Sequence, residues 1–218
     1  MIHTTISEMK NEDFKYFLIP FIIIWIVGLI LWSITDKVGM HIVLNGFHTP
    51  TLDIFFKYFT QIGGWVPCAV GGILLSLKKW RIAAVILLGQ LVATLITTPI
   101  KRIIQAPRPS VVLSELGIDF PIVEGVDLHS TLSFPSGHTS AAFAFCFAIS
   151  LFCPKWWQKM LCLFIAILCG YSRIYLSQHF LEDTLAGSLI GVISILVLIP
   201  LITKFKIPFH SSSYLKTK

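Results

Sequence analysis

Three short segments of the sequence combine basic side chains with serine, histidine and a carboxylate, which are residue types that bind phosphate and move protons. They are KRIIQAPRP (101–109), FPSGHTS (134–140) and YSRIYLSQHFLED (171–183). Arginine offers a planar pair of donors to phosphate oxygens, and lysine adds a point charge. A serine and a glycine at a helix start expose backbone N–H groups to an anion. Together these features indicate a phosphate site with acid–base chemistry.

The phosphate-binding candidates come from all three segments and are Lys101, Arg108, Ser136, Gly137 and Arg173. Two histidines and one carboxylate remain for the acid–base chemistry. Asp183 follows His179 by four residues. If the last helix begins early, the two share a face, and the carboxylate can hold one imidazole nitrogen while the other attacks. His138 can protonate the leaving oxygen and then activate the water that cleaves a phosphohistidine. The residues alone leave open which histidine attacks.

Each feature also has an ordinary explanation when it is taken alone. The basic residues of the first segment, Arg102 among them, could extend to lipid headgroups. His138 could belong to an ordinary helix start, and His179 with Asp183 could form a surface pair. All three segments, however, lie at predicted helix ends on the same side of the membrane. Charged groups are far better tolerated there than in a helix centre, so a shared polar site is the favoured interpretation.

The composition identifies the class of protein that positions these residues. Of the 218 residues, 55% are hydrophobic and 13% are charged, whereas about 25% are charged in typical soluble domains. The mean hydropathy is +0.80. These values exclude disordered, coiled-coil and disulfide-scaffold proteins and indicate an integral membrane protein.

Six apolar stretches approach the ~20 residues that a membrane-spanning helix needs. They cover residues 16–34, 61–77, 81–98, 139–153, 160–176 and 184–203, and an aromatic segment at 52–59 is expected at the interface. The fourth stretch is short, so its helix either begins below the headgroups or continues past Pro154. The sequence predicts an all-α fold: a polytopic membrane helical bundle with six transmembrane helices. Residues 1–218 form a single domain, and an outer loop over 99–137 carries the first two segments.

The placement of the basic residues predicts the orientation of the bundle. The 17 Lys and Arg residues exceed the 11 Asp and Glu residues. Six spans put both termini on one side, and the first helix is expected to remain uncleaved. If that side is the cytoplasm, eleven basic residues lie inside and six outside, which is the asymmetry typical of membrane proteins. The orientation of the helices in the membrane thus explains most of the positive charge, which therefore indicates no nucleic-acid partner.

The three segments resemble the motifs of the type-2 phosphatidic acid phosphatase superfamily, the lipid phosphate phosphatases that are related to vanadium haloperoxidases. The first motif, Lys, six residues, Arg-Pro, is matched by 101–109, and the second, Pro-Ser-Gly-His, by 135–138. The third, Ser-Arg, five residues, His, three residues, Asp, is matched by 172–183. All three occur in order without departure at a defining position. The six apolar stretches make a soluble haloperoxidase an unfavourable alternative.

The resemblance implies a role for each candidate. It implies that His179 is the nucleophile, Asp183 its orienting partner and His138 the general acid. It assigns phosphate binding to Lys101, Arg108, Ser136, Gly137 and Arg173. It implies a hydrolase that needs no metal and no other cofactor.

A phosphate site at helix ends near the interface favours a lipid substrate, because the hydrocarbon chains can stay in the bilayer. Phosphatidic acid, phosphatidylglycerophosphate, undecaprenyl diphosphate and the phosphates of lipid A are all candidates. Two alternatives stay open: a lipid phosphotransferase that uses the same site, and a non-catalytic lipid or anion transporter. In a bacterium, the protein is expected in the inner membrane, with the active site on the extracytoplasmic face and both termini in the cytoplasm.

Overall fold

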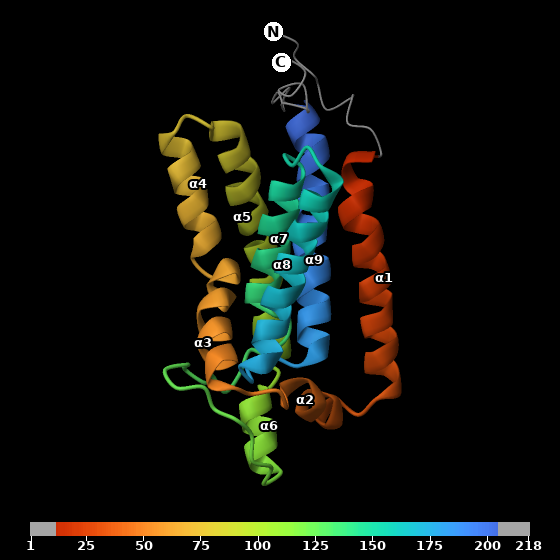
Figure 1. Cartoon of the computed structure of the whole chain (residues 1–218), viewed down its shortest axis with the longest axis vertical. Helices are drawn as coiled ribbons and strands as arrows, with labels where there is room; N and C mark the ends of the chain where they lie inside the picture. Colours follow the sequence, from red (N-terminus) through yellow and green to blue (C-terminus); the bar gives the residue numbers. More distant parts are fainter. Residues whose placement is uncertain (1–11, 205–218) are drawn as a thin grey trace.

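A computed structural model describes residues 12–204, and all regular elements in this range are helical (Figure 1). The elements are α1 (Glu12–Ile34), α2 (Lys37–Asn45), α3 (Pro50–Phe59), the 3-10 helix η2 (Thr60–Gly63), α4 (Val66–Ser76), α5 (Trp80–Ile104), α6 (Pro109–Glu115), α7 (Gly137–Ser150), α8 (Trp156–Tyr175) and α9 (Leu181–Lys204). The expected orientation of Lys10, Lys206, Lys216 and Lys218 concerns positions outside the described residues.

Three helical segments of the described chain are long and apolar enough to cross a membrane, namely Phe14–Ile34, Ile82–Glu115 and Leu181–Pro200. A fourth candidate is the pair Pro50–Gly63 and Val66–Ser76, which is bent by 54°. The chain is therefore an all-helical integral membrane protein, and the number of six spans stays a prediction. The segment expected at the interface forms α3, which continues through η2 into α4.

Helix α7 is the short central helix of the bundle. Its 14 residues rise about 21 Å at 1.5 Å per residue, which is less than the ~30 Å hydrocarbon core of a bilayer. The helix ends at Ser150, so of the two explanations for the short stretch, continuation past Pro154 is wrong. Helices α5, α8 and α9 surround it. Most of its side chains are buried, and many of them are alanine or serine, which lets the neighbouring helices approach closely.

Two glycines allow α9 to lie directly against α7. A Cβ at Gly187 would come within 2.5 Å of the backbone oxygen of Ser136, and a Cβ at Gly191 would clash with the backbone oxygen of Ser140. Glycines four residues apart form the kind of face on which membrane helices pack backbone to backbone. This contact brings the start of α9 to the start of α7, where the second and third motifs lie.

Helix α1 stands at the edge of the bundle, beside α8 and α9 (Figure 1). Phe17 is fully buried and stacks on Phe147 of α7, with the ring centroids 4.7 Å apart. Trp25 Nε1 donates a hydrogen bond to the backbone oxygen of Leu185, at 3.0 Å. The opposite face of α1 exposes isoleucine and leucine side chains, as is expected of a surface that meets lipid.

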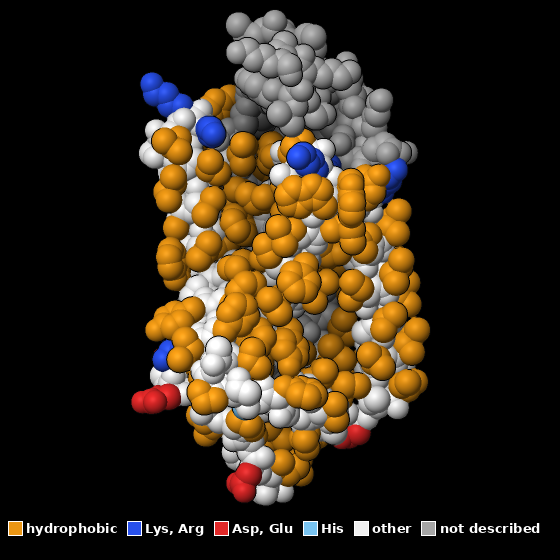
Figure 2. All heavy atoms as spheres, in the orientation of Figure 1, with side chains coloured by type: hydrophobic (Ala, Val, Ile, Leu, Met, Phe, Trp, Pro, Cys, Tyr) orange, Lys and Arg blue, Asp and Glu red, His pale blue; other side chains and the backbone are white. Residues whose placement is uncertain are grey.

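The charged side chains divide between the two ends of the molecule. Figure 2 shows hydrophobic side chains along the flank of the bundle, with most visible Lys and Arg near the end where α1 begins and the visible Asp and Glu toward the opposite end. At that opposite end α5 stops, α7 begins, α8 stops and α9 begins (Figure 1). The three motifs were predicted at these four helix ends, and the structure confirms this arrangement.

Helix α2 lies across the same end and secures the terminus of α8. The buried Asn45 Nδ2 donates to the backbone oxygens of Ile174, at 3.0 Å, and Tyr175, at 2.7 Å. The last carbonyl groups of a helix have no partner within the helix, so this side chain satisfies two of them. The bond therefore holds the turn of α8 that carries Arg173.

Candidate active site

The predicted site residues lie at the ends of five helices and in one connection. Lys101 is in the last turn of α5, Arg108 precedes α6, Ser136, Gly137 and His138 begin α7, Arg173 is in the last turn of α8, His179 lies between α8 and α9, and Asp183 is in the first turn of α9. Electrostatic interactions connect His138 with His179, Arg173, Arg108 and Lys101. The fold thus brings together residues that are up to 82 positions apart, Lys101 and Asp183 being the first and last.

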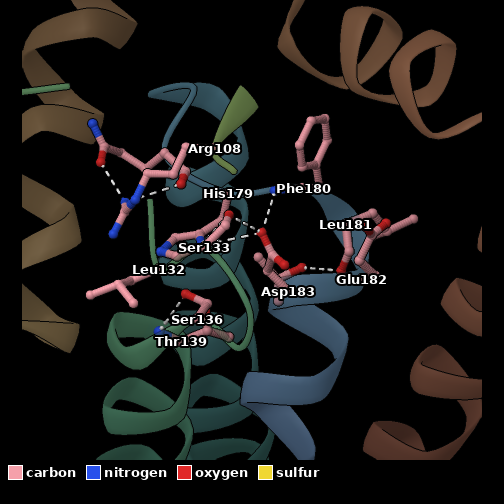
Figure 3. A network of polar contacts seen from close by, with 12 residues as sticks. Arg108, Leu132, Ser133, Ser136, Thr139, His179, Phe180, Leu181, Glu182 and Asp183 are labelled. Atoms are coloured by element: carbon pink, nitrogen blue, oxygen red, sulfur yellow. Dashed lines mark hydrogen bonds and ion pairs between the residues drawn. The ribbon is translucent and has the colours of Figure 1, made fainter. Parts of the chain in front are cut away.

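The carboxylate of Asp183 accepts several bonds beside the ring of His179 (Figure 3). His179 Nδ1 lies 3.3 Å from Asp183 Oδ2. The same oxygen accepts the Ser133 hydroxyl at 2.5 Å and the Phe180 backbone N–H at 2.9 Å. Because α9 begins at Leu181, it does not begin early enough for His179 and Asp183 to share a helical face. They meet across the helix start, with Nδ1 of the imidazole beside the carboxylate.

Ser136 caps the start of α7, as predicted. Its hydroxyl oxygen accepts the backbone N–H of Thr139 at 3.3 Å and the hydroxyl of Thr139 at 2.8 Å (Figure 3). Ser136 is fully buried, and its backbone N–H donates to the backbone oxygen of Asp183 at 2.9 Å. These bonds set the direction of α7, whose first N–H groups carry the positive end of the helix dipole.

Lys101 lies beside the first residue of α7. A Cβ placed on Gly137 would be 3.8 Å from Cε of Lys101. The ammonium group donates to the backbone oxygens of Leu132 and Ser133, the latter at 3.2 Å. These carbonyl contacts place a positive charge next to the helix start, where it can add to the attraction of an anion.

Arg108 is buried and is held by neutral groups. Its Nε donates to the Thr131 backbone oxygen at 3.0 Å, and Nη1 donates to the backbone oxygen of Gln178 at 3.1 Å and to its side-chain Oε1 at 2.8 Å. Gln178 Nε2 in turn donates to the Asp127 backbone oxygen at 2.9 Å. The guanidinium is thus oriented without a carboxylate partner, and its charge is available to an anionic ligand.

Arg173 is the second buried guanidinium. Its Nη1 donates to the hydroxyl of Thr60, in η2, at 2.7 Å, and its buried Nε has no partner among the described residues. A buried charged donor without a partner is costly, so its presence points to a ligand that would satisfy it. The same 3-10 helix supports His138, because a Cβ on Gly63 would clash with the backbone oxygen of His138.

The environment of His179 favours the neutral imidazole. Burial lowers the pKa of His179 well below its usual value, and the charges of Arg173, Arg108 and Lys101 lower it further. The cationic form is disfavoured by both causes. A neutral imidazole has an unprotonated ring nitrogen, which is the state that a nucleophile requires.

The described residues contain no group of three or more His, Cys, Asp and Glu side chains placed to hold a metal ion. The groups at the site that can attract an anion are the three cations and the start of α7. A model of the PAP2 superfamily matches residues 79–207, which is more than half of the chain and includes all three motifs.

The chain belongs to the PAP2 superfamily.

Relatives and a solved structure of this superfamily resemble the chain over most of its length. The lipid A 4'-phosphatase of Bacteroides thetaiotaomicron is 29% identical over 155 residues, which cover 67% of this chain and 68% of that protein. The undecaprenyl-diphosphatase of Sulfolobus acidocaldarius is 26% identical over 155 residues, covering 68% of this chain and 66% of that protein. The crystal structure of Aquifex aeolicus LpxE superposes with a TM-score of 0.65 and 28% identity, and covers 75% of this chain and 94% of that one.

The structure adds contacts that the motifs did not identify. Ser133 precedes the second motif by two residues, and Gln178 directly precedes His179, so proximity in sequence was a usable signal for both. Thr60 lies 41 residues before the first motif and outside the residues that the PAP2 model matches. No sequence feature distinguishes it from other threonines, and only the fold brings it to Arg173.

We expect Thr60→Val to weaken the binding of inorganic phosphate, whereas Thr60→Ser retains it. The valine keeps the shape but removes the hydroxyl that orients Arg173. A hydrogen bond to a charged group is worth about 1.5–3 kcal/mol, so the dissociation constant should rise roughly tenfold or more. Calorimetric titration of the purified variants measures this, with thermal unfolding as the control for folding. Equal phosphate affinity in Thr60→Val and the wild type would contradict the positioning role.

We also expect His179 to stay neutral in the ligand-free protein when the pH falls from 7 to 5. An ordinary histidine becomes protonated over this range, but burial and three nearby cations oppose the charge on His179. NMR of protein with ¹⁵N-labelled histidine follows the ring nitrogens, and His179→Asn identifies the signal. A His179 imidazolium signal at pH 6 would show that the site does not depress its pKa.

Proposed function

We propose that the protein is a hydrolase that removes phosphate from a lipid phosphomonoester or diphosphate through a phosphohistidine on His179. The observation that carries the proposal is the environment of that residue. His179 is buried, its pKa is lowered well below the usual value, and its Nδ1 lies beside Asp183. The charges of Arg173, Arg108 and Lys101 act on the ring, and the start of α7 is bonded to Asp183. This arrangement combines a nucleophile with the groups that stabilise a phosphoryl transition state.

In the first step, His179 Nε2 attacks phosphorus while Asp183 accepts the hydrogen bond from Nδ1–H. The N–P bond forms and the bond from phosphorus to the lipid oxygen breaks. His138 is protonated when the bound phosphate offsets the charges of the three cations, and it donates this proton to the leaving oxygen. Lys101, Arg108, Arg173 and the backbone N–H groups at Gly137 bind the equatorial oxygens, and Ser136 contributes by capping the helix that carries those N–H groups.

In the second step, water attacks the phosphorus of the phosphohistidine. His138, now neutral, takes the proton from this water, so it returns to the form that began the cycle. The N–P bond breaks and leaves His179 neutral, with inorganic phosphate as the product. Each group in this scheme belongs to the protein, and we propose that no metal ion takes part.

A lipid is the substrate class that suits this position of the site. The site lies at the end of an apolar bundle, and relatives of the chain carry the names lipid A 4'-phosphatase and undecaprenyl-diphosphatase. A lipid can present its phosphate there while its chains remain beside the hydrophobic flank of the protein (Figure 2). We therefore propose a membrane lipid phosphate over a water-soluble ester.

We further propose that six helical segments cross the membrane and that both termini lie in the cytoplasm. The segments are α1, α3 with α4, α5, α7, α8 and α9. In a bacterium, this topology puts the protein in the inner membrane with the site on the extracytoplasmic face. The charge distribution supports it, because Lys78, Lys79 and Lys155 all lie in connections at the end opposite the site.

We expect the purified protein in detergent to release phosphate from lipid phosphates in the presence of a metal chelator. His179→Ala should abolish release, and His138→Ala should lower kcat by about 10²- to 10⁴-fold, which is the usual contribution of a general acid. His129→Ala is the matched control, because His129 is exposed in the outer connection and should leave the activity unchanged. Unchanged release by folded His179→Ala would contradict the proposal.

The fate of labelled phosphate separates this proposal from the two alternatives. Hydrolysis places the label in inorganic phosphate. A phosphotransferase would place it on an acceptor lipid, and a transporter in reconstituted vesicles would move the lipid without releasing phosphate.

A further inference from the structure

An apolar cavity of about 200 Å³ lies beside the candidate site, between α1, α7, α8 and α9. Each helix contributes one face to its wall. Helix α8 supplies Ile167 and Ile174, α9 supplies Leu185, and α1 supplies Phe21 and Gly28. Residues seven positions apart on α8 are separated by about 10 Å along the helix axis. The cavity therefore extends in the same direction as the helices, which is the direction of the hydrocarbon chains in a bilayer.

The character of the wall selects the kind of ligand. Apolar cavities in proteins stay dry and accept apolar molecules, and an engineered cavity of ~150 Å³ is large enough for benzene. The cavity described here is larger, and apolar side chains form most of its wall. A hydrocarbon segment fits this environment, whereas a charged headgroup would lose its hydration without gaining partners.

The cavity adjoins the phosphate site through residues next to the motif positions. Thr139 lines the cavity, and its hydroxyl donates to Ser136, the residue that caps α7. Ile174 follows Arg173, and Thr184, which also lines the cavity, follows Asp183. A ligand whose phosphate contacts the cations could thus extend a chain past Thr139 into the cavity. A bilayer lipid without a terminal phosphate could not contact the cations in this way, so it would not be held in this position.

Helix α1 closes the outer side of the cavity. Trp25 Nε1 donates to the backbone oxygen of Leu185 at 3.0 Å and holds α1 against α9. A Cβ on Gly28 would approach Cδ2 of Leu185 at 2.8 Å, so a side chain at position 28 would displace Leu185 and take up space in the cavity. Both α1 residues precede residues 79–207, the part that the PAP2 model matches. The motifs therefore do not account for this wall.

We propose that this cavity binds one hydrocarbon chain of the lipid phosphate whose headgroup occupies the site. The inference rests on the proposed function, since it assigns the second half of the same substrate. In this proposal, α1, α8 and α9 recognise the hydrocarbon chain, whereas the cations bind the phosphate.

Filling the cavity tests the proposal through the difference between two substrates. Gly28→Leu should raise KM at least about tenfold for the long-chain lipid phosphate that the wild type hydrolyses fastest. It should leave kcat and KM for phenyl phosphate, which has no chain, unchanged. Gly72→Leu is the matched control, because a Cβ at Gly72 on α4 would meet nothing within 4 Å. An unchanged KM for the long-chain substrate, or an equal loss with phenyl phosphate, would overturn the proposal.

A cross-linking measurement tests the same proposal without turnover and without a change in the cavity. Phosphatidic acid with a diazirine in one acyl chain is bound to the His179→Ala protein, and the labelled peptides are identified after irradiation. We expect labels around Gly28 and Leu185, and far less labelling by the corresponding diacylglycerol, which lacks the phosphate. Labels elsewhere, or equal labelling by diacylglycerol, would overturn the chain site. If these labels appear but the wild type releases no phosphate, the proposed hydrolysis fails and the chain site stands.

Discussion

The Asp183 carboxylate is the interaction on which the arrangement of the site depends. One oxygen accepts bonds from the Ser133 hydroxyl and the Phe180 backbone N–H and lies beside Nδ1 of His179. The backbone oxygen of the same residue accepts the N–H of Ser136. A single residue thus ties the second motif to the third. In a buried site each of these bonds is strong and each unmade bond is costly, so the elements are fixed relative to one another.

The membrane explains why the site takes this form. Charged groups are costly in hydrocarbon, so the cations and histidines gather at helix ends. The helices can bring those ends together because the residues at their contacts are small. Gly187 of α9, for example, lies against the backbone of Ser136. The 3-10 helix η2, which precedes the three motifs in the sequence, also contacts residues of the site. Thr60 binds Arg173 and Gly63 lies against His138, so α3 and η2 position groups that the later helices carry.

The sequence predicted the parts of the site that depend on residue type and order. The three motifs identified the cations, the histidines and the carboxylate, and the apolar stretches identified helices whose ends meet at one side. It did not predict Thr60, because a hydroxyl 41 residues before the first motif carries no local signal. It paired His179 with Asp183 on the condition that the last helix begins early, whereas α9 begins at Leu181 and the pair meets across the helix start. The apolar cavity beside α1 was invisible as well, because hydropathy does not distinguish a side chain that faces lipid from one that lines a cavity.

Rapid quenching of a reaction with ³²P-labelled lipid phosphate tests whether His179 carries the phosphoryl group. The N–P bond of a phosphohistidine is stable in base and labile in acid, unlike a phosphoserine ester. We expect protein quenched in base within the first turnover to carry the label on the peptide that contains His179, and we expect the label to disappear in acid. Label on another residue, or hydrolysis in a single turnover with no labelled protein at any time, would contradict this role of His179.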